Sequence, residues 1–191
     1  MKLLAVSVGI FALTVPMTMA QASTWKADPG HSQVDFTITH LSVSKTHGRF
    51  GDVNAIIHYD QADVAKTTVQ ATVSVVGVNT DEPGRDDEIK SADFFDVDDY
   101  PTAKFVSTAV SKNGNGLWVK GNLTLHGVTK PVVLNVQKLA QPAGDPGGKQ
   151  ESKFTATATI NRTAFGIGPG FPAGIVGDEV QLKIDLNAVK Q

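Results

Sequence analysis

Hydrophobic and polar residues alternate along most of the chain, and the alternation is clearest in the stretch Gly116–Val136. Side chains of a β-strand point to opposite faces in turn, so this pattern predicts strands with one buried face and one face in water. A short segment, 127–131, separates two such runs, which is typical of a β-hairpin. Pro131 has no N–H for a strand ladder, and we therefore place it at the first position of the second strand.

The same alternation recurs through the chain and predicts eight strands. No stretch has the period of a long helix, and no strand alternates with a helix, so the predicted fold class is all-β. An antiparallel sheet of eight strands would leave two open edges, which closure removes. The sequence therefore predicts an eight-stranded antiparallel up-and-down barrel. The predicted strands are His31–Leu41, Gly51–Asp60, Thr67–Val78, Ala103–Ser111, Gly116–His126, Pro131–Gln137, Lys153–Arg162 and Glu179–Val189.

The residues predicted to face the interior include several small ones. A barrel of eight strands either fills its interior with side chains or holds one small ligand there. Small side chains leave space, which favours an apolar cavity, whereas the alternative is that loop aromatics such as Phe94, Phe95 and Phe171 fill it. The small inward residues are Ala55, Ala71, Gly121, Ala156 and Ala158.

The alternation breaks between Asn79 and Pro101. Within this segment Arg85–Ser91 can form one or two helical turns. A loop of this length in a compact domain is usually functional or a lid. We therefore expect a short helical loop whose Phe94 and Phe95 pack over an opening of the barrel.

Alternate strands of an up-and-down barrel end at the same rim, so the loops after His40, His126 and Arg162 are predicted to meet. His40 and Arg162 each close an inward-facing apolar row. A buried guanidinium needs partners. These are either the polar head of an amphiphile or acidic residues of the long loop, and both alternatives stay open. His40 is either a core histidine or a ligand contact. The acidic candidates are Asp86, Asp93 and Asp96, and the other polar and basic residues of this rim are Ser42, Lys45, His47, Arg49, Arg85, Lys90 and Lys130.

The N-terminus has the features of a secretory signal peptide. Lys2 precedes an apolar run, 3–15, and Ala20-Gln21-Ala22 resembles a cleavage site. We therefore divide the chain into a signal peptide, 1–22, and a single barrel domain, 23–191, with no transmembrane segment after signal removal. The chain has no cysteine, so neither a disulfide nor a thiolate nucleophile is available.

Charge and motifs exclude several function classes. The net charge of −2, lowered further when Lys2 is removed, gives no general attraction to nucleic acid or to anionic membranes. The sequence has no G-x-S-x-G motif and no H-x-H or H-E-x-x-H spacing. We therefore do not expect an enzyme. Two alternatives remain, an enzyme that acts on an amphiphilic lipid at the barrel mouth and a stress-protection or interaction module with a filled barrel.

Several motifs together resemble the YceI family of polyisoprenoid-binding periplasmic proteins, over essentially all of the mature chain. Proline around Pro169 and Pro172 is more frequent than that family suggests. The motifs are His31-Ser32-x-Val34-x-Phe36, His40-Leu41, Gly48-Arg49-Phe50, Arg85-Asp86, Ile89-Lys90-Ser91, Asp93-Phe94-Phe95-Asp96-Val97, Tyr100-Pro101-x-Ala103-x-Phe105, Gly121-x-Leu123-Thr124-Leu125-His126-Gly127-Val128-Thr129-Lys130-Pro131, Arg162-x-x-Phe165-Gly166 and Gly177-Asp178-Glu179-Val180.

The resemblance implies an extended, lipocalin-like eight-stranded barrel that holds a long isoprenoid or another amphiphilic lipid. It also suggests export to the periplasm and, for many members, a homodimer. No cofactor is implied, and the bound molecule is an isoprenoid lipid or a quinone. We expect a periplasmic lipid carrier in which His40, Arg85 and Arg162 meet the head group. The residues expected to contact the tail are Phe36, Ile38, Val53, Val73, Phe94, Leu123, Leu125, Phe154, Ile160, Phe165 and Leu182.

Overall fold

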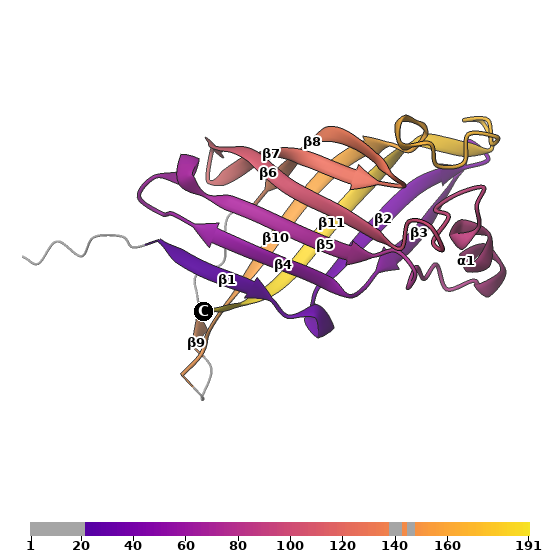
Figure 1. Cartoon of the computed structure of the whole chain (residues 1–191). Helices are drawn as coiled ribbons and strands as arrows, with labels where there is room; N and C mark the ends of the chain where they lie inside the picture. The colour runs from indigo at the N-terminus through magenta and orange to yellow at the C-terminus, as the bar shows by residue number, and fades with distance from the viewer. Residues whose placement is uncertain (1–21, 138–142, 145–147) are drawn as a thin grey trace, which may run out of the picture.

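The computed structural model describes residues 22–137, 143–144 and 148–191, so the predicted signal peptide lies outside it except for its last residue. Its strands and one short helix confirm the all-β class with a short helical loop (Figure 1). The helix is α1 (Pro83–Lys90). The strands are β1 (Ser23–Ala27), β2 (Gln33–His40), β3 (Ser44–Phe50), β4 (Val53–Tyr59), β5 (Thr68–Ser74), β6 (Thr102–Asn113), β7 (Gly116–Leu125), β8 (Val128–Val136), β9 (Ala143–Gly144), β10 (Gln150–Asn161) and β11 (Val176–Lys190).

The strands form one closed antiparallel barrel with eight strand positions around its wall. From β4 to β8 each strand pairs with the next, then β8 pairs with β10 and β10 with β11. β2 pairs with the first part of β11 and β1 with its end, so β1 and β2 together occupy one strand position of the barrel. β3 and β4 together occupy the neighbouring strand position, because β3 pairs with β2 and β4 pairs with β1. This arrangement confirms the predicted eight-stranded up-and-down barrel.

Three strand segments, β1, β3 and the two-residue β9, were missing from the sequence-based prediction. β1 has five residues, and only Trp25 and Ala27 mark its buried face. β3 carries almost no apolar residues, because its inward face at the barrel mouth includes Thr46 and Gly48. Alternation of hydrophobicity cannot reveal a strand whose inward residues are polar or are glycines without a side chain.

The barrel wall is incomplete between β8 and β10. These two strands pair only at Val136–Ala156 and Asn135–Thr157, although both continue through described residues toward the rim with the long loops. Pro131 pairs with Asn122 of β7 and lies in the part of β8 that has no partner in β10, where its missing N–H costs no ladder bond to β10. Our placement of Pro131 at the start of that strand was wrong, because β8 begins at Val128 after a tight turn at His126 and Gly127.

Helix α1 is held at its first turn by local side-chain bonds. Pro83 occupies the start of the helix, and the Glu82 carboxylate accepts hydrogen bonds from the Gly84 and Arg85 N–H groups. A capping carboxylate satisfies N–H groups that have no partner within the helix. Asp86 then accepts from Thr80 and ties the helix back to the chain that leaves the barrel.

Gly48 on β3 is where the backbone approaches a core ring most closely. A Cβ added there would lie 2.3 Å from the Phe36 ring and 2.8 Å from the Thr80 methyl. We expect Gly48→Ala to lower the free energy of unfolding by about 1–3 kcal/mol, because the ring must leave its rotamer. Gly51→Ala is the matched control, since a Cβ at Gly51 meets nothing within 4 Å. Urea denaturation of both variants measures the difference, and equal stabilities would contradict it.

Asp185, on the outer face of β11, makes the stability of the barrel depend on pH in the acid range. A hydrogen bond from Lys183 Nζ (2.6 Å), supported by one from the Thr155 hydroxyl (2.8 Å), holds the pKa of the Asp185 carboxyl below its ordinary value of 3.8. A carboxyl whose pKa is lower in the folded than in the unfolded protein stabilises the fold at pH values above its unfolded-state pKa. This stabilisation is lost as the pH falls through its folded-state pKa. We expect Asp185→Asn to lose less stability than the wild type between about pH 5 and pH 3. Urea midpoints at the two pH values test this, and equal losses would contradict it.

Candidate functional site

The barrel encloses an apolar cavity of about 300 Å³. Ligand pockets typically measure about 300–1,000 Å³, so the cavity lies at the small end of this range. Thirteen of the fourteen residues predicted to contact a ligand line it. They are Phe36, Ile38, His40, Val53, Val73, Arg85, Phe94, Leu123, Leu125, Phe154, Ile160, Arg162 and Leu182.

The exception is Phe165, which does not line the cavity. It is fully buried in the rim, and its carbonyl oxygen accepts a hydrogen bond from His126 Nδ1 (3.1 Å). We expected Phe165 to contact the tail although the predicted strand ends at Arg162. In the structure β10 ends at Asn161, and Thr163–Phe165 is a short 3₁₀ helix. Its side chain belongs to the same buried cluster as Phe94, Leu125 and Ile160, but it does not line the cavity.

Two of the five small residues predicted to open the interior line the cavity. Ala71 and Ala156 line it, whereas Ala55, Gly121 and Ala158 do not. Gly121 does not open space, because the Phe105 ring occupies the position above it, 2.4 Å from where a Cβ would stand. The cavity residues that the prediction missed belong to the same inward rows, so extending each row would have found most of them. Among them are Val34, Ile57, Val69, Phe105, Val119 and Ile184.

Loops lie over the end of the barrel where α1 lies (Figure 1), and residues of these loops, among them Phe94 and Ile167, line the cavity. Phe94 and Phe95 line the cavity, as expected of residues over an opening. The Phe94 ring packs against Phe171 of the opposite loop with centroids 4.8 Å apart. The Gly168 N–H donates to the Asp93 carbonyl oxygen (3.0 Å), so the two loops are also joined through the backbone.

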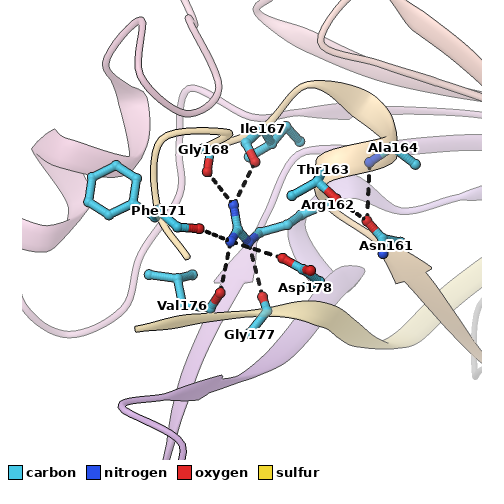
Figure 2. Close-up of polar contacts among 10 residues, drawn as sticks. All are labelled: Asn161, Arg162, Thr163, Ala164, Ile167, Gly168, Phe171, Val176, Gly177 and Asp178. Atoms are coloured by element: carbon cyan, nitrogen blue, oxygen red, sulfur yellow. Dashed lines mark hydrogen bonds and ion pairs between the residues drawn. The ribbon is translucent and has the colours of Figure 1, made fainter. Parts of the chain in front are cut away.

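Arg162 is the polar centre of the rim, and only 3% of its surface is exposed. Figure 2 shows its guanidinium surrounded by backbone carbonyls. Nε donates to Gly177 (3.0 Å), and Nη1 donates to Ile167 (2.9 Å) and Gly168. Nη2 donates to the Phe171 (2.7 Å) and Val176 (2.8 Å) carbonyls and lies 3.1 Å from Asp178 Oδ1. One side chain therefore holds the whole loop 163–178 in place.

The ion partner of Arg162 differs from the three candidates that the sequence suggested. It is Asp178, at the start of β11, and not Asp86, Asp93 or Asp96 of the long loop. All five N–H groups of a guanidinium are donors, and here each has an acceptor within the chain. A ligand head group would have to displace one of these acceptors to bind Arg162.

The other two expected head-group contacts lie at the mouth. His40 is half-buried at the end of β2, and Arg85 is half-buried on α1. Arg85 donates from Nε to the Thr80 hydroxyl and from Nη2 to the Thr80 carbonyl, both at 2.9 Å. Polar lining residues gather here, because Thr39, Thr46 and Glu88 also line the cavity.

The charge at this rim differs from loop to loop. Segment 79–101, which contains α1, carries nine Asp and Glu residues against Arg85 and Lys90. The opposite loop, 163–177, carries no charged side chain. Of the two long rim loops, the one that contains α1 is therefore acidic and the one before β11 is uncharged, whereas Lys45 and Lys130 belong to the β2–β3 and β7–β8 hairpins of the same rim.

Within residues 22–137, 143–144 and 148–191, no three histidine, aspartate or glutamate side chains lie close enough together to hold a metal ion. The same part of the chain has no helix that is both long enough and apolar enough to span a membrane.

Known proteins resemble this chain over most of its length. The model of the YceI-like domain matches residues 25–188. A UPF0312 protein of Pseudomonas paraeruginosa is 33% identical over 189 residues, covering 99% of this chain and 97% of the relative. The crystal structure of BcnA from Burkholderia cenocepacia has a TM-score of 0.76 and 30% identity, covering 84% of this chain and 98% of BcnA. A polyisoprenoid binding domain from Saccharophagus degradans shares the fold, with a TM-score of 0.61, 16% identity and coverage of 88% of this chain and 98% of that domain.

Proposed function

Since the chain belongs to the YceI-like domain family, we propose that it is a periplasmic carrier that holds a polyisoprenoid or a similar long-chain lipid in its barrel. The observation that carries this proposal is the continuous apolar cavity inside a closed barrel. The charged lining groups lie at one end of the apolar cavity, with only Tyr59 and Thr67 as polar lining residues at the other, and this matches an amphiphile with a long tail and a small head. The name of the Saccharophagus domain supports the same class of ligand.

Burial of the tail would supply most of the affinity. A long isoprenoid tail has several hundred Å² of apolar surface, and at about 25 cal/mol per Å² its burial contributes on the order of 10 kcal/mol before ordering costs. The head group would set the orientation of the ligand at the mouth. We assign the head-group contacts to His40 and Arg85, because the N–H groups of Arg162 already have acceptors in the chain.

A binding role is supported more strongly than catalysis. The cavity lining is dominated by aliphatic and aromatic side chains, and its polar members are few. General acid–base or nucleophilic catalysis needs a nucleophile or base held within hydrogen-bond reach of the reacting atom. Among the described residues, the Ser44 hydroxyl donates to the His40 carbonyl oxygen, and no hydrogen bond joins the His40 ring to a serine, threonine or carboxylate.

The proposal is tested with protein purified gently from its own host. Denaturing mass spectrometry is expected to detect a co-purified lipid. Addition of an isoprenoid quinone with a long tail is expected to raise the melting temperature by several degrees, because a ligand that binds only the folded state stabilises it. The matched control is the same quinone without its tail, which should give no increase. Absence of lipid together with no response to the tailed quinone would refute the proposal.

A further inference from the structure

Two loops at the mouth join to form an exposed apolar surface. The turn between β2 and β3 contains Leu41 and Val43, and the loop before β11 contains Pro172, Ala173 and Ile175; we call these five residues the apolar tip. The Leu41 N–H donates to the Ile175 carbonyl (2.8 Å), which joins the two loops. The exposed fractions are 55% for Leu41, 89% for Val43 and 45% for Ile175. Pro172 and Ala173 are exposed as well.

The apolar tip is unusual because its loops have no charged side chain. Neither 38–44 nor 163–177 contains Asp, Glu, Lys or Arg, in a chain of which 19% is charged. Single exposed apolar residues are common on protein surfaces. A cluster of them is typical of a surface that contacts a partner or a membrane. Leu41 also has a positive φ of 50°, which is uncommon for a leucine and turns the loop at this point.

The apolar tip is continuous with the cavity. His40 immediately precedes Leu41, Val176 immediately follows Ile175, and both His40 and Val176 line the cavity. Figure 1 shows the end of β2 beside the loop that leads into β11, at the same end of the barrel as α1. A molecule that covers the tip therefore lies next to whatever enters or leaves the barrel.

We propose that the apolar tip inserts into the interfacial region of a lipid bilayer and docks the mouth of the barrel there. This inference rests on the proposed function, because a carrier of a membrane lipid has to receive its ligand from a bilayer. A convex tip of uncharged residues can enter the interface without burying a charge. The surface thus serves for loading and release of the lipid.

The acidic segment 79–101 at the mouth determines to which bilayers the apolar tip binds best. The carboxylates of segment 79–101 would be repelled by anionic head groups. Lys45 is the nearest cation along the β2–β3 turn, and its Nζ lies 3.0 Å from the Thr39 hydroxyl. We therefore infer a preference for zwitterionic bilayers, in contrast to proteins that bind membranes through basic patches.

The absence of cysteine allows a direct test of insertion. Val43→Cys carries an environment-sensitive dye at the tip, and Val106→Cys carries it on the barrel wall, where Val106 is 50% exposed. With phosphatidylcholine vesicles, the dye at position 43 is expected to shift its emission to the blue and to become protected from aqueous iodide. The dye at position 106 is expected to stay unchanged. Replacing part of the lipid by phosphatidylglycerol is expected to weaken the response.

Three outcomes of this test would overturn the inference. The first is no shift at position 43, and the second is an equal shift at both positions. The third is a shift that depends on protein concentration without vesicles, which would assign the tip to contact with a second copy of the chain.

Transfer kinetics separate this inference from the proposed function. In the double variant Leu41→Ser/Val43→Ser, transfer of a long-tailed quinone between phosphatidylcholine vesicles is expected to slow at least tenfold, with equilibrium binding of the quinone unchanged. Val106→Ser is expected to transfer at the wild-type rate. Normal binding with undiminished transfer in the double variant would overturn the docking surface alone. Absence of quinone binding in the wild type would refute the proposed carrier function. It would then also refute the role of the tip in loading and release of the lipid.

Discussion

Arg162→Met is expected to lower the free energy of unfolding by about 3–5 kcal/mol, which is the largest single effect on stability that we expect. The guanidinium satisfies five backbone carbonyls and one carboxylate in loop 163–178, and it is almost completely buried. Methionine has a similar length but no donor. The loop must then open to water to satisfy its carbonyls, which also removes Phe171 from the Phe94 ring.

Two further variants make this expectation specific. Arg162→Lys is expected to recover less than half of the loss, because an ammonium has three donors and cannot reproduce the planar arrangement of five. Arg49→Met, at an exposed ion pair with Asp81, is expected to change stability by less than about 1 kcal/mol. Urea denaturation measures all three variants. A loss of only about 1 kcal/mol in Arg162→Met would show that the loop is held mainly by its other contacts.

Ala156→Phe is expected to reduce the lipid bound per protein at least tenfold, which is the largest effect on function that we expect. Ala156 lines the cavity from β10, so a phenylalanine ring there occupies the space that a lipid tail would need. Thermal stability is expected to stay within a few degrees of the wild type, because the new ring enters an existing apolar space. Extraction of the purified protein followed by mass spectrometry measures the bound lipid.

The matched control for this variant is Ala109→Phe on β6. Ala109 is exposed on the outer face of the barrel, so the same substitution adds the same ring without entering the cavity. Its lipid content is expected to equal that of the wild type. Unchanged lipid content in Ala156→Phe would place the bound lipid outside the barrel.

Much of the fold could be predicted because each long strand has one face in the barrel and one in water. β7 and β11 illustrate this, since their alternation continues along almost their whole length. β3 could not be predicted in this way, because its inward residues at the mouth are a threonine and a glycine. The alternation reports burial of apolar side chains, and it reports a strand only where such burial occurs.

Most of the cavity lining was predicted for the same physical reason. Leu123, Leu125 and Leu182 point inward because strand geometry requires it, whatever the rest of the fold does. Phe165 lies beyond the predicted strand, in a 3₁₀ segment that follows the end of β10, so alternation could not place its side chain.

The amino-acid sequence by itself determined the class of fold, the hollow apolar interior and the identity of most residues that line it, because these depend on local alternation and side-chain size. Only the tertiary structure decided the partners of Arg162, since backbone carbonyls are present in every residue and leave no trace in the sequence. It also decided that the apolar turn at Val43 lies beside Ile175, 132 positions further along the chain. Such contacts depend on where the closed barrel brings its loops, and neither hydrophobic period nor charge count contains that information.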